Sequence, residues 1–230
     1  MKKIITKDSS ITFFNQEFKE NLHPESGAIE SVYKRYINHL NLKDNIKVLD
    51  IGFGIGYISL IILSKVNANI TALEKNKEYI ELMKNLDLPE SLKEAHKKLK
   101  KVNIIMGDAN KTIKEIKNKF DLIILDTFSQ INNKELYSID FLKELKNRMH
   151  KNSILITYSS NPVVRFNLME SGFKLKKYRI SKYEEGTIAN FNEENLKESD
   201  KKLIRAFSLP IQNTSKEVNL IQSIKDKYNN

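Results

Sequence analysis

Apolar and polar positions follow two different periods along most of the chain. Short runs rich in β-branched residues predict strands, and apolar residues spaced three and four apart predict helices. The predicted strands are Lys47–Ile51, Asn69–Leu73, Val102–Met106, Leu122–Leu125, Ser153–Thr157 and Lys174–Ile180. The predicted helices are Tyr57–Lys65, Lys77–Leu86, Glu90–Lys100, Ala109–Lys119, Tyr137–Met149 and Pro162–Ser171. This alternation indicates an α/β fold in which right-handed crossovers join parallel strands.

The two ends of the chain depart from this alternation. Near the start, Ser10–Phe14 predicts part of a small hairpin, and a helix is predicted over Ala28–Leu40. Further on, Gly186–Phe191 predicts a strand that only a short polar turn separates from Lys174–Ile180. Such a turn has no room for a crossover helix, so these two strands are expected to be antiparallel neighbours.

These patterns divide the chain into three parts. Residues 1–42 are expected to form a hairpin and helix that cap the ligand site, and residues 43–192 to form the core of the fold. Residues 193–230 are more charged and less apolar, and are expected to pack on the core or to fray from it. Within them, Glu217–Tyr228 has the pattern of a marginal terminal helix.

A glycine-rich turn joins the first strand of the core to its first helix. Three of the 7 glycines in the chain, Gly52, Gly54 and Gly56, occur there with the spacing G-x-G-x-G. Glycine lets the backbone approach a ligand closely, and the following helix N-terminus adds free N–H groups and partial positive charge. Open α/β sheets bind their ligands at the carboxyl ends of strands, so a nucleotide-like ligand is expected here.

The residues around this turn narrow the class of nucleotide. A dinucleotide fingerprint would place its third glycine at position 57, which is Tyr57 here, and an acid, Asp50, precedes the turn. A carboxylate suits a pyrophosphate poorly. It suits a cationic or zwitterionic group well, such as the amino-acid end of S-adenosylmethionine.

Two further acids follow the next strands. Glu74 can accept hydrogen bonds from both hydroxyls of a ribose, although a solvated glutamate at a strand end has the same pattern. Asp108, in the run Gly107-Asp108-Ala109, can accept from an adenine amino group or can be only the N-cap of a helix.

A fourth strand-end acid begins the run Asp126-Thr-Phe-Ser129. An acid, two hydroxyls and an aromatic ring leave the sheet together there, beside the glycine turn if the strands are parallel neighbours. Four acids at four strand ends favour a nucleoside site over a fold that merely places acids at random.

Composition adds limits on the chemistry. The net charge of +10 and a pI near 9.4 suit a nucleic-acid partner, although a chain rich in Lys, Ile and Asn can be basic through genome composition alone.

The absence of cysteine excludes disulfides, thiolate nucleophiles and cysteine-bound zinc. The four histidines show no metal-ligand spacing, so no metal is expected. With no signal-peptide pattern and no long apolar run, a soluble cytoplasmic protein without membrane contact is expected.

The glycine turn and the strand-end acids together resemble the class I S-adenosylmethionine-dependent methyltransferases. The resemblance implies a Rossmann-like fold, with a seven-stranded, mostly parallel sheet, an antiparallel last strand and helices on both faces. It implies S-adenosyl-L-methionine as cofactor. The cofactor-binding residues implied are Asp50, Gly52, Gly54, Gly56, Glu74, Asp108, Ala109, Asp126 and, in the N-terminal segment, Gly27.

A narrower resemblance, to the MnmC-type tRNA methyltransferases, covers most of residues 8–190. It rests on Asp8–Phe14, His23–Gly27 with Glu30, Phe120–Ser129, Leu155–Ser159 with Val163 and Arg165, Gly172-Phe173, and Gly186–Ala189. It implies methylation of the amine of 5-aminomethyl-(2-thio)uridine at the wobble position of tRNA. The chain has no room for a flavin oxidase domain, so the stand-alone form is expected. Three positions depart from the family pattern: Thr127 where a small Gly or Ala is usual, Lys134 for proline and Tyr137 for tryptophan.

The resemblance also assigns roles on the acceptor side. Asp126 would hydrogen-bond the ammonium and orient its lone pair once the proton has left, which makes it the catalytic residue. Phe128 and Tyr158 would stack on the uracil, or else pack in the core, and Ser129 would lie on the substrate side. Arg165 and nearby lysines would hold tRNA phosphates, unless Arg165 forms a surface salt bridge.

Other functions share parts of these sequence patterns. A methyltransferase or polyamine aminopropyltransferase acting on another amine shares much of the architecture, but an acidic pocket for a polycation suits a net charge of +10 poorly. Tyr57 and Asp50 disfavour a nicotinamide oxidoreductase. A non-catalytic RNA-binding module would keep the basic surface but has no use for four strand-end acids.

Overall fold

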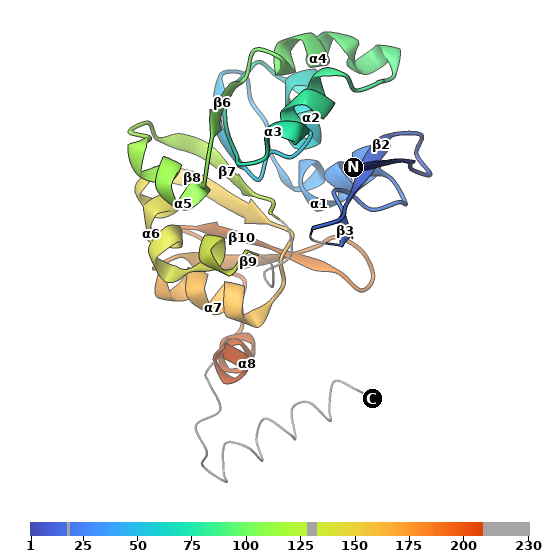
Figure 1. Ribbon diagram of the computed structural model, residues 1–230. Coiled ribbons are helices and arrows are strands. Elements are labelled where there is room, and N and C mark those ends of the chain that lie inside the picture. Colours follow the sequence, from blue (N-terminus) through green and yellow to red (C-terminus); the bar gives the residue numbers. More distant parts are fainter. Residues whose placement is uncertain (18, 128–132, 209–230) are drawn as a thin grey trace.

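The computed structural model describes residues 1–17, 19–127 and 133–208, and its core is a seven-stranded sheet in the order β6-β5-β4-β7-β8-β10-β9 (Figure 1). The strands are β4 (Ile46–Ile51), β5 (Ala68–Glu74), β6 (Asn103–Met106), β7 (Phe120–Leu125), β8 (Met149–Thr157), β9 (Lys174–Arg179) and β10 (Glu185–Asn190). Four pairings are parallel, and β10 is antiparallel to both β8 and β9. The predicted sheet, including its antiparallel last strand, is confirmed.

Helices cover both faces of this sheet. They are α1 (Ala28–Arg35), α2 (Tyr57–Lys65), α3 (Lys77–Lys84), α4 (Lys93–Leu99), α5 (Ala109–Glu115), α6 (Ile139–Asn147), α7 (Pro162–Glu170) and α8 (Glu198–Ser208), with 3-10 turns at Ile37–His39, Glu90–Leu92 and Lys134–Tyr137. In Figure 1, α1 to α4 lie on one side of the sheet and α5 to α7 on the other.

The alternation of side chains along each strand explains how one sheet contributes to a hydrophobic cluster on each of its faces. Successive side chains of a strand point to opposite faces. In β4, Val48 belongs to the cluster under α1 to α4, whereas Leu49 belongs to the cluster under α5 to α7, and both are fully buried. Buried on both faces, the central strands read as continuous apolar runs, as parallel sheets do.

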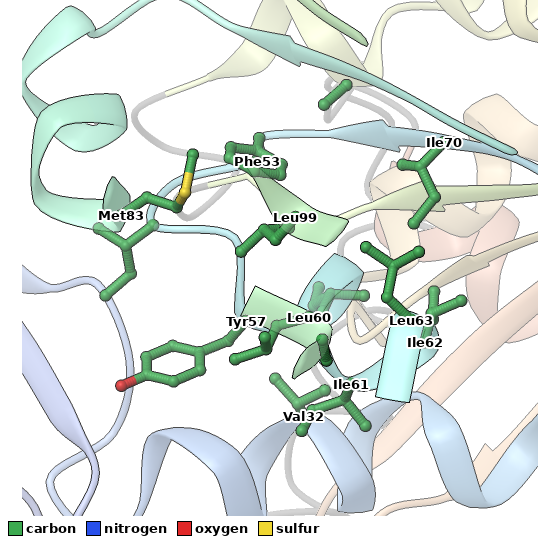
Figure 2. Close-up of a cluster of buried hydrophobic side chains, with 14 of the residues drawn as sticks. Val32, Phe53, Tyr57, Leu60, Ile61, Ile62, Leu63, Ile70, Met83 and Leu99 are labelled. Carbon is green, nitrogen blue, oxygen red and sulfur yellow. The ribbon is translucent and has the colours of Figure 1, made fainter. Parts of the chain in front are cut away.

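The first of these clusters surrounds α2, the helix that follows the glycine turn (Figure 2). All residues from Tyr57 to Leu63 are buried, because α1, α4 and the sheet enclose the helix. Figure 2 shows the Tyr57 hydroxyl pointing away from the apolar side chains around it. That hydroxyl donates to the Ile11 carbonyl oxygen at 3.0 Å and accepts from the Ile11 N–H at 3.1 Å.

These hydrogen bonds attach a small N-terminal sheet to the core. Its strands β1 (Lys2–Ile5), β2 (Ile11–Asn15) and β3 (Glu20–Asn21) are antiparallel in the order β1-β2-β3. At the other end of the described chain, Leu196 and Ile204 are buried in the cluster under α5 to α7, so α8 packs beside α7. The segment Glu217–Tyr228, predicted as a marginal helix, lies outside the described residues.

Several predicted helices are shorter than expected. The segment predicted as one helix over Tyr137–Met149 is a 3-10 turn followed by α6, because the Ser138 side chain accepts the Phe141 N–H and caps a new helix. Strand β8 then begins at Met149 and includes the predicted Ser153–Thr157. No helix in the part of the chain that the structure describes is long and apolar enough to cross a membrane.

Candidate functional site

A cavity of about 640 Å³ lies at the carboxyl ends of the central strands. The turns after β4, β5, β6 and β7 form one side of it, and α1 with the segment around β3 forms the other. Its charged lining residues are Glu17, Glu20, Arg35, Glu74, Lys75, Asp108, Asp126 and Glu135. We call this hollow the carboxyl-edge cavity. It lies where open α/β sheets bind their ligands.

The glycine turn contributes two of its three glycines to this cavity, Gly52 and Gly54. Gly52 has φ +82°, and a Cβ there would overlap the carbonyl oxygen of Asp126. Only glycine therefore fits, because both the backbone angle and the close approach to the β7 end exclude a side chain. Gly56 is not a lining residue: its φ is +81° and a Cβ would meet the Phe53 ring and Leu99. Gly56 therefore has a packing role at the start of α2, and its predicted contact with the cofactor stays a prediction.

Asp50 lies behind this turn and is also absent from the cavity lining. Its side chain is 1% exposed; Oδ2 accepts a 2.6 Å hydrogen bond from the Ser59 hydroxyl, and Oδ1 is buried with no hydrogen-bond partner among the residues described. Burial raises the pKa of this carboxyl to about 7, against the lowering effect of Ser59. An orphaned carboxylate oxygen behind a ligand loop suits a positively charged ligand group, reached directly or through water.

Glu74 lines the cavity and is held by three backbone N–H groups. Its Oε2 accepts from Gly54 at 2.8 Å, and its Oε1 accepts from Lys75 at 2.8 Å and Asn76 at 2.9 Å. Burial raises the pKa of this carboxyl, and the three N–H groups oppose the rise. A carboxylate has about four lone-pair sites, so one acceptor site of Glu74 remains for a ligand hydroxyl.

Asp108 and Ala109 also line the cavity, at the start of α5. Asp108 is the N-cap of that helix, since Oδ1 accepts the Asn110 N–H at 3.0 Å. Its exposed carboxylate keeps Oδ2 without a hydrogen bond in the described part of the chain. The helix-capping interpretation is therefore confirmed, and the contact with an adenine amino group stays a prediction.

Asp126 directly follows β7, and its N–H donates to the Ile51 carbonyl oxygen at 3.0 Å. Burial raises the pKa of its carboxyl; the positive charge of Arg35 and the Tyr36 hydroxyl oppose the rise. The Tyr36 hydroxyl is buried, and among the described residues it has no well-formed hydrogen bond. The end of β7 thus faces the last turn of α1, a helix that sequence reasoning placed near the site without assigning it a polar role.

Arg35 is the principal residue that the sequence analysis missed. It lines the cavity, and its Cζ lies 4.7 Å from the centroid of the Tyr158 ring. The Tyr158 hydroxyl donates to the Thr127 carbonyl oxygen at 3.2 Å, so this ring is fixed at both its face and its tip. Tyr158 was expected on the substrate side of the site, and it lines the cavity wall. Its stacking on a base stays a prediction.

Two of the three departures from the family pattern are in contact. The buried Thr127 hydroxyl donates to the Tyr137 hydroxyl at 3.1 Å. Each hydroxyl thereby supplies the other with a hydrogen-bond partner. The paired substitution keeps this wall of the cavity free of a mismatch in polar groups.

Two predicted site residues lie elsewhere. Arg165 is 7% exposed and is absent from the cavity lining; it donates to the Thr187 hydroxyl at 2.9 Å and to the Gly186 carbonyl oxygen at 3.2 Å, and pairs with Glu185 at 3.4 Å. This corrects the predicted phosphate contact, because the guanidinium is committed to β10. Gly27 has φ +154°, adjoins the Asp8 carboxylate and is not among the residues that line the cavity, so its predicted cofactor contact stays a prediction.

Phe128 and Ser129 lie outside the described residues, so their predicted substrate contacts stay predictions. Within the described ranges, no group of three or more His, Asp or Glu side chains is arranged to hold a metal ion. The cavity therefore offers carboxylates, backbone N–H groups, one guanidinium and aromatic rings as its chemical groups.

Comparison with known proteins gives a consistent set of relatives. A family profile described as S-adenosyl-L-methionine-dependent methyltransferase matches residues 63–191, more than half of the chain. An uncharacterized protein of Methanocaldococcus jannaschii is 28% identical over 96% of this chain and 70% of its own length. The tRNA 5-methylaminomethyl-2-thiouridine biosynthesis bifunctional protein MnmC of Campylobacter hominis is 24% identical over 70% of this chain, but over only 28% of its own length. The chain therefore corresponds to a minor part of that bifunctional relative.

Solved structures agree with the sequence relatives. The crystal structure of MnmC2 from Aquifex aeolicus is 29% identical, covers 94% of this chain and 79% of its own, and superposes with a TM-score of 0.76. Spermidine synthase from Thermotoga maritima covers 92% of this chain and 84% of its own at 14% identity and a TM-score of 0.54, a likeness that shows the fold alone.

Proposed function

The chain belongs to the family of S-adenosyl-L-methionine-dependent methyltransferases, and from that premise we propose that it methylates the amine of 5-aminomethyl-(2-thio)uridine at the wobble position of tRNA. The observation that carries the proposal is the position of Asp126. Its backbone adjoins Gly52 of the glycine turn, and its carboxylate lines the same cavity as Glu74. An acid suited to an amine acceptor and the residues suited to the methyl donor thus share one cavity.

The residues present fit the methyl donor. Gly52 and Gly54 give it a backbone surface without side chains, and Glu74 keeps one acceptor site for a ribose hydroxyl. Asp108 and Ala109 border the place for the adenine, and the orphaned oxygen of Asp50 lies behind the turn. When bound, S-adenosyl-L-methionine supplies an electrophilic methyl group on a positively charged sulfur. The carboxylates around the cavity are well matched to that positive charge.

Asp126 prepares the acceptor in this proposal. An aminomethyl group is largely protonated near neutral pH and must lose a proton before it can attack. The Asp126 carboxylate accepts a hydrogen bond from the ammonium and holds its nitrogen in line with the methyl group to be transferred. After one proton has passed to water, the carboxylate still accepts a hydrogen bond from an N–H of the neutral amine. Holding reactants in line supplies roughly 7–11 kcal/mol of a reaction barrier.

Arg35 assists Asp126 through its charge. A cation in the cavity wall favours the ionised form of Asp126 and disfavours a second cation close by. It therefore lowers the pKa of a neighbouring substrate ammonium and increases the fraction of neutral amine. The packing of Arg35 on Tyr158 holds that charge in the wall.

Residues 1–42 serve as a cap over this site in the same proposal. Their segment from Glu17 to Pro24 contributes several residues to the cavity lining, and Arg35 and Tyr36 of α1 face Asp126. Tyr158, with Phe128 outside the described residues, would stack on the uracil, since single-stranded RNA bases are read by aromatic stacking. The name of the Campylobacter hominis relative, a tRNA 5-methylaminomethyl-2-thiouridine biosynthesis protein, supports tRNA as the acceptor.

A second candidate is methyl transfer to an amine of a small polyamine. The carboxyl-edge cavity is lined by six acids, Glu17, Glu20, Glu74, Asp108, Asp126 and Glu135, against the cations Arg35 and Lys75. An acidic cavity in a protein with a net charge of +10 removes the objection that the sequence raised against a polycationic substrate.

One experiment separates the two candidates. Labelled S-adenosyl-L-methionine is incubated with the protein and with tRNA bearing 5-aminomethyl-uridine, the same tRNA bearing uridine, or putrescine. The proposal predicts label transfer to the aminomethyl tRNA alone. Transfer to putrescine alone would support the second candidate, and transfer to none of the three, with cofactor binding intact by calorimetry, would reject both.

A further inference from the structure

A second hollow, of about 620 Å³, lies at the opposite edge of the sheet. Its lining comes from the amino ends of β4, β5, β6, β7 and β8 and from the end of α4. We call it the amino-edge basin. Its basic residues are the four lysines Lys47, Lys98, Lys101 and Lys119 and one histidine, His150.

The fold brings these residues together from distant parts of the sequence. Lys47 is the second residue of β4, Lys119 immediately precedes β7, and His150 is the second residue of β8. Parallel strands begin at one edge of a sheet, so residues at their starts become neighbours. Lys98 and Lys101 come to the same edge from the connection between α4 and β6.

The basin contrasts with the carboxyl-edge cavity in charge. None of its described lining residues is acidic, whereas the carboxyl-edge cavity has six acids. Two carboxylates accept backbone N–H groups of lining residues: Asp121 accepts the Lys47 N–H at 2.9 Å, and Asp44 accepts the Asn67 N–H at 2.8 Å. The two edges of one sheet thus carry opposite charge.

Two lysines of α4 that lie outside the basin form ion pairs. Lys93 pairs with Glu90 at 2.5 Å and Lys97 with Glu94 at 2.6 Å, at i,i+3 spacing. Lys98, the next residue after Lys97, turns to the basin, and no ion pair of Lys47, Lys98, Lys101 or Lys119 occurs within the described ranges. The basin therefore gathers four lysines whose charge no ion pair among the described residues offsets.

Amide side chains complete the lining and point to the class of ligand. Four asparagines, Asn67, Asn69, Asn103 and Asn118, border the same hollow. Lysine and asparagine side chains are donors that commonly contact phosphate oxygens. Unpaired like charges repel one another, and bound phosphates would remove that repulsion.

We propose that the amino-edge basin binds phosphate groups, and that their source is an RNA backbone held away from the reacting nucleotide. Four lysines from separate parts of the chain match several phosphates in a row better than one. The six residues of β4 separate the two edges by about 20 Å at roughly 3.3 Å per residue, so the basin affects RNA affinity and not the chemical step. The proposal does not depend on which RNA atom is methylated.

The test uses a matched pair of full-length variants. One carries Lys47→Gln, Lys98→Gln, Lys101→Gln and Lys119→Gln; the control carries Lys111→Gln, Lys114→Gln, Lys143→Gln and Lys202→Gln, exposed lysines outside the basin with the same loss of charge. Affinity for labelled tRNA is measured against salt concentration. We expect the basin variant to bind about tenfold or more weakly, with a salt slope smaller by roughly 2 to 4, and the control to change less than twofold.

Inorganic tripolyphosphate, titrated by calorimetry, distinguishes the two sources of phosphate. If the proposal holds, tripolyphosphate competes with tRNA on the wild type and loses affinity on the basin variant. Tripolyphosphate binding with unchanged tRNA affinity would reject RNA as the source, and equal losses in both variants would overturn the basin as a site. S-adenosyl-L-methionine affinity and melting temperature check the fold, and the methylation rate at saturating tRNA should stay unchanged, which separates this outcome from failure of the proposed function.

Discussion

The guanidinium of Arg35 lies over the ring of Tyr158, with 4.7 Å between Cζ and the ring centroid. The two residues come from α1 and from the end of β8, and both line the carboxyl-edge cavity. The Tyr178 hydroxyl, from β9, donates to the Arg35 carbonyl oxygen at 2.6 Å and fixes the backbone beneath. A positive charge is therefore built into the wall opposite the glycine turn, close enough to Asp126 to lower the pKa of that carboxyl against the effect of burial.

Replacing Arg35 by glutamine should move the acid limb of the pH profile of kcat/KM. Loss of the cation raises the pKa of both Asp126 and the substrate ammonium, so the neutral amine and the carboxylate appear only at higher pH. We expect the limb to shift upward by about one pH unit. The measurement is the rate of methyl transfer to aminomethyl-bearing tRNA as a function of pH.

Arg35→Lys is the matched control for this prediction. Lysine keeps the charge but loses the planar packing on Tyr158. Its acid limb should stay within a few tenths of a pH unit of the wild type, even if the rate falls. An Arg35→Gln profile that drops uniformly, with no displacement along the pH axis, would show that Arg35 acts only through packing.

Asp50→Asn should change how the stability of the cofactor-free protein depends on pH. The folded pKa of Asp50 is raised from 3.8 to about 7, so between these values the folded state holds a proton that the unfolded state has lost. The wild-type protein therefore loses stability as the pH rises through this window. Asparagine has no proton that titrates there, so the variant does not share this loss. Relative to wild type, the variant should gain roughly 2 to 3 kcal/mol in unfolding free energy between pH 5 and pH 8.

Denaturant unfolding at the two pH values checks this prediction. Any constant effect of the amide on packing cancels in the comparison between pH values. Ser59→Ala provides a second check: without the hydroxyl that lowers the pKa of Asp50, the loss of stability with rising pH should continue to higher pH and be larger in total. A difference between wild type and Asp50→Asn that is independent of pH would mean that Asp50 is ionised throughout.

Glu74→Gln should weaken binding of S-adenosyl-L-methionine. The amide keeps one acceptor oxygen, so it cannot serve the N–H groups of Gly54 and Lys75 together and still accept from a ribose hydroxyl. We expect a loss of about 1–3 kcal/mol, or roughly 5- to 150-fold in Kd. Isothermal titration measures it, and Glu81→Gln, on the exposed face of α3, should leave the affinity unchanged.

The glycine turn allows a prediction from two neighbouring glycines. An alanine at position 52 would overlap the Asp126 carbonyl oxygen, whereas one at position 54 would enter open space, with Gly52 oxygen 3.9 Å away. Gly54→Ala should cost about 1–2 kcal/mol for a left-handed alanine, and Gly52→Ala should cost more and displace Asp126. Melting temperatures and transfer rates of the pair measure this difference; equal effects would contradict it.

Much of the fold could be predicted from the sequence, because periodicity is local and strong. The parallel sheet is predicted by the continuous apolar run of β4 and by the alternation of strands and helices. Its antiparallel strand is predicted by the short polar turn before Gly186. The boundaries were harder to place where a side chain decides them. Ser138 begins a new helix inside one apolar pattern because its hydroxyl caps α6.

The candidate site was predictable only in part. Glu74, Asp108 and Asp126 follow from strand ends, which the topology must bring to one edge. The contact of Arg35 with Tyr158 joins residues more than a hundred positions apart, and no local sequence pattern predicts such a contact. Arg165 was misassigned because a motif does not tell an exposed cation from one buried against Thr187.

The identity of the methylated atom tests the central claim most directly. Aminomethyl-bearing tRNA is incubated with the protein and with S-adenosyl-L-methionine carrying a labelled methyl group, then digested to nucleosides and analysed by mass spectrometry. The account predicts the label on the exocyclic amine of the wobble uridine, with transfer strongly reduced in Asp126→Asn and cofactor affinity nearly unchanged. Label on a ring carbon or a ribose hydroxyl, or an undiminished rate in Asp126→Asn, would contradict it.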